Sequence, residues 1–150
     1  MRMKNQAYLK IVGEDDKAYV DLDTYGVTLV RGWREALLTP TGVKSLVTND
    51  NRLEHGVAVM AKAANIKKDK RDVSLSFFLE GTSEEDYLQK YENFLAKIAY
   101  GGQFCFKVPC LKRVFKFVYS SCSKYGDYGL EKSNFTLKLT EYNPEDREAI

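Results

Sequence analysis

The stretch from Asp72 to Glu80 alternates between apolar and other side chains, and this pattern constrains the fold more than any other feature. Every second position is apolar, and the residues at these positions are Val73, Leu75, Phe77 and Leu79. Successive side chains of a β-strand point to opposite faces, so the pattern predicts a strand with one fully buried side. Gly81 then ends the alternation.

A helix is predicted directly after this strand, over about residues 83–100. Thr82 to Asp86 contains two overlapping capping-box registers, Thr82/Glu85 and Ser83/Asp86. Apolar residues then recur at helical spacing and form one stripe, made of Tyr87, Leu88, Tyr91, Phe94, Leu95 and Ile98. Gly101 and Gly102 supply the left-handed stop.

Period-two alternation returns after the helix and also dominates the N-terminal third. Strands are predicted at residues 103–108, 111–120 and 133–142, at 8–12 and 18–22 as a hairpin, and at 27–30. The polar stretch between Ser121 and Lys132 is interpreted as a long hairpin loop. The pattern as a whole predicts an α+β, mainly β fold with one flanking helix.

The 150 residues fit a single domain whose core buries about 70% of the surface of the extended chain. Two segments fall outside the predicted elements. Residues 39–71 form a long loop in which only Val57 to Met60 has a strand-like pattern, and residues 143–150 form a frayed tail. Neither a membrane span nor a signal peptide is predicted.

The residues that catalysis needs do not converge in this sequence. His55 is the only histidine, and in its polar loop a solvated side chain is favoured over a general base. The acidic run at 84–86 is explained by the positive end of the helix dipole rather than by a metal site. Cys105, Cys110 and Cys122 match no paired metal spacing and are interpreted as reduced structural residues. We therefore expect no enzyme, metal or cofactor.

A nucleic-acid-binding module is one alternative. Lys112, Arg113 and Lys116 lie on an aromatic-rich predicted strand, as in sheet surfaces that stack bases. The favoured explanation is that Phe115 and Phe117 belong to the core and that the lysines solubilise the other face. The net charge of +2 is small for a dedicated nucleic-acid binder.

A structural subunit that presents surface to its neighbours is the other alternative. Tyr125 and Tyr128 on a glycine-bearing loop suit a contact surface, although an ordinary exposed loop explains them equally well. The basic residues of the long loop extend the candidate subunit interface, which then comprises Lys62, Lys67, Lys68, Arg71, Tyr125 and Tyr128.

The order of the predicted elements resembles the tail-tube-type β domain of long-tailed phages, particularly the N-terminal domain of distal tail proteins. The resemblance covers about residues 57–144. It rests on the strand RDVSLSFFLEG, the helix stripe YLQKYENFLAKIAYGG, the strand RVFKFVY and the final LTEYNP. Tail-tube and tail-completion subunits remain equally open, because distal tail proteins often carry a second, C-terminal domain.

The resemblance implies an antiparallel β-sandwich or barrel with a helix packed on its flank. It also implies a non-enzymatic phage or prophage tail protein whose copies form a ring, commonly a hexamer, around a channel that passes DNA. Residues 39–71 would then be the long hairpin or loop that reaches a neighbouring subunit. The expected partners are further copies and other tail proteins, and the expected location is the virion, after synthesis in the bacterial cytoplasm.

Overall fold

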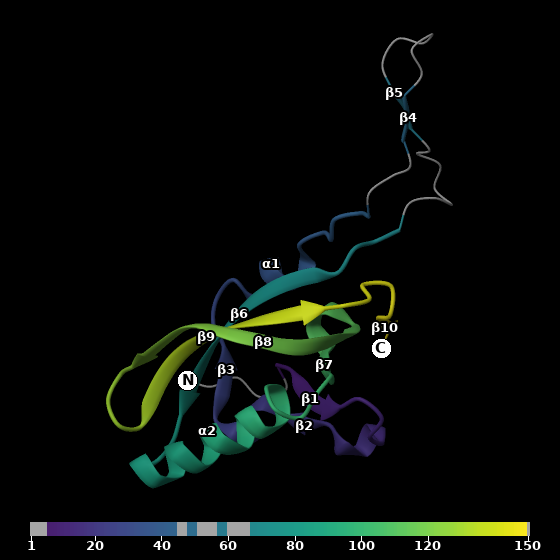
Figure 1. Ribbon diagram of the computed structural model, residues 1–150. Coiled ribbons are helices and arrows are strands. Elements are labelled where there is room, and N and C mark those ends of the chain that lie inside the picture. Colours follow the sequence, from purple (N-terminus) through teal and green to yellow (C-terminus); the bar gives the residue numbers. More distant parts are fainter. Residues whose placement is uncertain (1–5, 45–47, 51–56, 60–66, 150) are drawn as a thin grey trace.

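A computed structural model describes residues 6–44, 48–50, 57–59 and 67–149 (Figure 1). Its main feature is one antiparallel sheet in which the strands follow the order β2-β1-β7-β8-β9-β6-β3. These strands are β1 (Tyr8–Ile11), β2 (Val20–Asp21), β3 (Val27–Leu29), β6 (Arg71–Glu80), β7 (Phe104–Val108), β8 (Arg113–Asp127) and β9 (Lys132–Glu141). The expected α+β, mainly β class is confirmed, as are all the predicted strands of this sheet.

The long strand β8 joins the two halves of the sheet. Its residues from Arg113 to Phe117 pair with β7, and its residues from Val118 to Asp127 pair with β9. Two register shifts, between Tyr119 and Ser121 and between Cys122 and Lys124, interrupt the second ladder. Such bulges bend a strand and increase its twist. Both halves contribute to a single hydrophobic core.

Phenylalanines from the sheet and the helix dominate this core. The fully buried ones are Phe77, Phe94, Phe104, Phe106, Phe115, Phe117 and Phe135. Helix α2 (Glu84–Ile98) inserts Phe94 between the sheet side chains, with ring centroids 5.4 Å from Phe77 and 6.1 Å from Phe135. Each buried phenylalanine stabilises the fold by about 1.5–3 kcal/mol relative to an exposed one.

The N-terminus of α2 follows the Ser83/Asp86 capping register. The Ser83 hydroxyl accepts the backbone N–H of Asp86 at 3.1 Å, and the Asp86 carboxylate accepts the N–H of Thr82 at 2.8 Å. The hydrogen bond from Thr82, together with Lys90 one turn later, lowers the pKa of the Asp86 carboxyl. The predicted helix is therefore confirmed.

The long hairpin loop predicted between Ser121 and Lys132 is wrong. β8 and β9 continue through this region, and only residues 128–131 connect them. The backbone ladder continues as far as the pairs Tyr125↔Phe135 and Asp127↔Ser133 although the side chains of β8 are mostly exposed there. A paired ribbon needs no apolar alternation, so the sequence pattern could not indicate it.

The prediction of a frayed tail also needs correction. Strand β10 (Glu148–Ala149) pairs with Val114 and Arg113 of β8, and Arg147 binds the buried Glu141. A second element that the sequence did not predict is the six-residue helix α1 (Trp33–Leu38). It is too short to establish a helical repeat. None of the described helices is long and apolar enough to cross a membrane.

Residues 39–70, here termed the arm, connect α1 to β6. The arm contains the antiparallel pair β4 (Thr48–Asp50) and β5 (Val57–Val59), which forms a sheet of its own and stands apart from the main sheet (Figure 1). Nearer the main sheet, Val43 bridges Lys68, and Lys44 donates its N–H to the carbonyl of Lys67 at 2.8 Å. The strand expected near Val57 is confirmed, and the arm is a hairpin over its described residues.

Gly81 is predicted to be essential for the junction of β6 and α2. A Cβ added there would lie 2.6 Å from the backbone nitrogen of Tyr87, whereas one added at Gly42 would meet open space. We expect Gly81→Ala to lower the free energy of unfolding by about 1–3 kcal/mol, the usual cost of overpacking. Gly42→Ala is the matched control and should leave stability unchanged or slightly higher. Chemical denaturation measures both variants, and equal stabilities would contradict the prediction.

Candidate assembly surfaces

Arg71, one of the predicted interface residues, is buried within the chain rather than exposed on a subunit surface. It begins β6 and lies opposite Glu141, with Nε 3.0 Å from Oε1 of that carboxylate. Its Nη1 donates to the carbonyls of Leu37 at 2.8 Å and Thr39 at 2.6 Å. Arg71 therefore holds the start of the arm, and its interface role stays a prediction.

Glu141 joins the start of the arm to the C-terminal segment, which comprises residues 145–149. Arg147 binds both of its oxygens, with Nε 2.8 Å from Oε2 and Nη2 2.7 Å from Oε1. This charge-assisted pair raises the pKa of Arg147, whereas burial lowers the pKa of Arg71. Both guanidinium groups lie over the ring of Phe115, at 5.9 Å for Arg71 and 5.1 Å for Arg147.

The other basic interface residues lie on the arm. Lys67 and Lys68 are exposed near its base, and Lys68 pairs with Glu145 of the C-terminal segment at 2.8 Å. Lys62 lies outside the described residues, as does His55. An interface role for Lys62, Lys67 and Lys68 stays a prediction.

The two predicted interface tyrosines lie at the far end of the β8–β9 hairpin and have different surroundings. Tyr125 packs on α2, because its hydroxyl lies 2.5 Å from that of Tyr87 and its ring stacks on Phe135. Burial and the hydrogen bond to Tyr87 raise the pKa of Tyr125. Tyr128 is more exposed, and its ring contacts Phe78 at 6.5 Å. Only Tyr128 leaves most of its side chain available to another molecule.

The phenylalanines and the basic residues at the start of β8 have different surroundings. Phe115 and Phe117 are buried in the core, as the favoured explanation expects. Lys116 is held within the chain, because its Nζ lies 3.0 Å from Asp146 and 3.6 Å from Glu148. Lys112 and Arg113 are exposed at the start of the strand. This arrangement gives a small basic edge that is partly neutralised by the acidic C-terminal segment.

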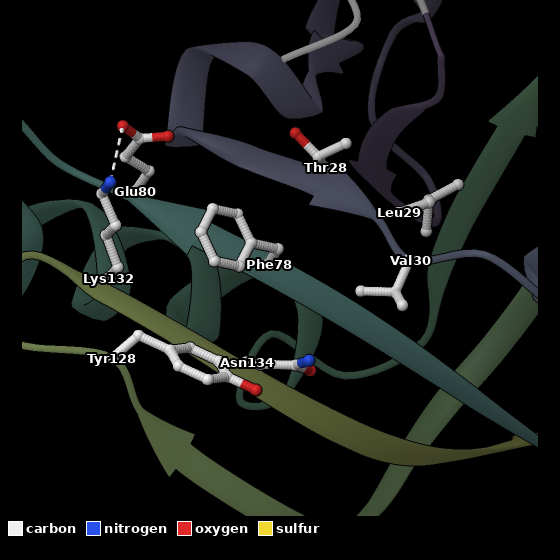
Figure 2. Close-up of a pocket in the computed structure, with 8 residues that line it drawn as sticks. All are labelled: Thr28, Leu29, Val30, Phe78, Glu80, Tyr128, Lys132 and Asn134. Atoms are coloured by element: carbon white, nitrogen blue, oxygen red, sulfur yellow. Dashed lines mark ion pairs between the residues drawn. The ribbon is translucent and has the colours of Figure 1, made fainter. Parts of the chain in front are cut away.

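A groove of about 550 Å³ crosses the outer face of β3, β6 and β9 (Figure 2). The rings of Phe78 and Tyr128 lie along it with Asn134, and the ion pair of Glu80 and Lys132, at 3.9 Å, closes one end. Further along the same face the side chains are small and hydroxylic, as in the 2.7 Å contact of Ser76 with Thr136. The groove and its surroundings form an open, mixed surface with no enclosed cavity.

Within the described part of the chain, no group of three or more His, Cys, Asp or Glu side chains is placed to hold a metal ion. The described cysteines, Cys105, Cys110 and Cys122, are all free thiols.

The same fold occurs in a phage protein. The chain is similar to the Dit protein of phage SPP1, described as a hub adsorption apparatus protein of phages that infect Gram-positive bacteria, with a TM-score of 0.56 and 14% sequence identity. The match covers 92% of this chain and 50% of the Dit chain, so this chain spans about half the length of that protein. No protein-family model and no curated protein matches the sequence.

Glu141 and Arg147 are the residues that sequence analysis missed at the base of the arm. The signal for Glu141 is its place near the end of a predicted strand, and the sequence pattern does not indicate Arg147. Recognising the pair of Arg71 and Glu141 requires the register of β6 on β9, which places these two residues opposite each other.

The hydroxyl of Tyr87 is predicted to hold the hairpin to α2. It contacts Tyr125 and donates to the buried Ser133 at 2.6 Å. Tyr87→Phe leaves the Ser133 hydroxyl without this partner, so we expect a loss of about 1–3 kcal/mol in the free energy of unfolding. Tyr125→Phe keeps the bond to Ser133 and should cost only about 0.5–1.5 kcal/mol. Urea denaturation compares the two, and a larger loss for Tyr125→Phe would refute this ranking.

Proposed function

We propose that this protein is a non-enzymatic structural subunit of a phage or prophage tail and that its copies form a ring. The observation that carries the proposal is the fold shared with the Dit protein over 92% of this chain. A distal tail role fits that likeness best, and tail-tube and tail-completion roles are the alternatives within the same class. Other tail proteins are then its partners, and the assembled virion is its location after synthesis in the bacterial cytoplasm.

The arm is the proposed contact with the neighbouring copy. Its β4–β5 pair stands apart from the main sheet, and Arg71 binds the carbonyls of Leu37 and Thr39, where α1 ends and the arm begins. A ring requires a heterologous interface, in which one patch meets a different patch on the next copy. An arm that begins from a fixed base can provide one of these patches, and the basic residues Lys62, Lys67 and Lys68 are the proposed contacts. Tyr128 supplies a second exposed contact on the hairpin.

The outer face of β6 and β9 is proposed to line the central channel of the ring, through which DNA would pass. Hydroxyls gather there, and the lysines are paired, as in Lys138 with Asp72 at 3.8 Å and Lys132 with Glu80 at 3.9 Å. A wall with little net charge would hold a polyanion weakly, because phosphate contacts by unpaired Lys and Arg dominate nucleic-acid affinity. DNA could then pass without being retained. A hexameric ring is the proposed copy number.

A shortened arm tests the proposed assembly. The N–H of Lys44 bonds to the carbonyl of Lys67, so a two-residue Asn-Gly turn in place of residues 45–66 would close the hairpin at its base. We expect the intact protein to form a closed oligomer at high concentration and the shortened variant to remain a folded monomer. Light scattering after size exclusion, at two salt concentrations, measures both masses, and negative stain shows whether particles are ring-shaped.

Three outcomes separate the possibilities. An intact protein that stays monomeric at every concentration contradicts self-assembly. Equal oligomers with and without the arm contradict the role of the arm but not the ring. Binding of short DNA that weakens steeply with salt would instead favour the nucleic-acid module, with Lys112, Arg113 and Lys116 as its contacts.

A further inference from the structure

Two arginines share one buried carboxylate where the arm joins the sheet. Arg147 occupies both oxygens of Glu141 with two well-formed hydrogen bonds. Arg71 reaches only Oε1, and its Nε contact at 3.0 Å is an ion pair without hydrogen-bond geometry. Its Nη2 has no hydrogen-bond partner among the described residues, although the side chain is buried. The guanidinium group of Arg71 is therefore not aligned to form hydrogen bonds with the Glu141 carboxylate.

The geometry gives a reason for this mismatch. The Nη1 of Arg71 donates to the carbonyls of Leu37 and Thr39, where α1 ends and the arm begins. A guanidinium group is rigid and planar, so the two bonds from Nη1 also fix the directions of Nε and Nη2, which make no hydrogen bond to the carboxylate. While Arg147 fills Glu141, the Arg71 side chain is directed toward the arm.

The C-terminal segment also contacts the second leg of the arm. Glu145 pairs with Lys68 at 2.8 Å, close to the Val43–Lys68 bridge. The segment is attached to the sheet through β10 and through the pair of Lys116 with Asp146. Residues 145–149 therefore contact the arm on one side and the sheet on the other.

We propose that docking of residues 145–149 sets the position of the arm through competition for Glu141. With Arg147 in place, Arg71 holds the carbonyls of Leu37 and Thr39. When the segment leaves, Nε and Nη2 of Arg71 turn onto the vacated carboxylate in the favoured two-point geometry, and Nη1 leaves the carbonyls. Any contact that pulls this segment away from the sheet would thereby loosen the arm. The coupling belongs to the single chain and does not depend on the proposed ring.

Hydrogen exchange of the arm measures this coupling. The N–H groups of Lys44 and Asp69 bond across the base of the arm, to the carbonyls of Lys67 and Gly42. In Arg147→Ala we expect both amides to exchange about tenfold faster, while the amides of the β6–β9 ladder keep their protection. Asp146→Asn is the matched control, because it removes an ion pair between the segment and β8 without touching Glu141. It should change exchange at Lys44 and Asp69 by less than about twofold.

The double variant Glu141→Gln/Arg147→Ala separates competition from simple loosening. It has the net charge of the native cluster but no carboxylate onto which Arg71 can turn. We expect its Lys44 and Asp69 amides to regain near-native protection although Arg147 is absent. Exchange as fast as in the single variant, or faster, would overturn the proposal, as would Arg147→Ala with native exchange at both amides. The measurement is made at concentrations where light scattering shows monomer, so a failure of ring assembly does not affect it.

Discussion

The ten-residue register between β6 and β9 is the constraint on which the rest of the structure depends. It pairs Phe77 with Phe135 on the core side and Ser76 with Thr136 on the outer side, and it ends with Arg71 opposite Glu141. A slip of one residue would exchange the two faces, because side chains alternate along a strand. Phe94 of α2 packs against Phe77 and Phe135, so the helix reinforces this register.

The same register places Arg71 and Glu141 where the sheet meets the arm and the C-terminal segment. Arg71 and Glu141 are the first and last residues of their strands, and both are buried. A buried ion pair is costly unless its charges are matched and hydrogen-bonded. Here α1 and the arm each supply one carbonyl, and the C-terminal segment supplies a second guanidinium group. The arm and the C-terminal segment lack a core of their own. They are therefore held in position by hydrogen bonds and ion pairs with the buried charges of the sheet.

The exposed surfaces differ in what they can offer to a partner. Tyr125 and Lys116 are engaged within the chain, whereas Tyr128 and the outer groove are open. The likeness to a phage hub protein extends over nearly the whole chain at the level of fold. Two lysines of the sheet are paired with carboxylates, Lys116 with Asp146 and Lys138 with Asp72.

Local patterns in the sequence determined the elements that bury one face. The alternation from Val73 to Leu79 and the capped stripe from Ser83 to Ile98 identify β6 and α2, because burial imposes a period on apolar residues. Only the tertiary structure decided where polar residues pair, because a backbone ladder or an ion pair imposes no period on the apolar residues of the sequence. The outer half of the β8–β9 hairpin, the docked β10 and the Arg71–Glu141–Arg147 cluster are of this kind. They depend on which strands become neighbours and in which register, and that is set by packing of the whole core.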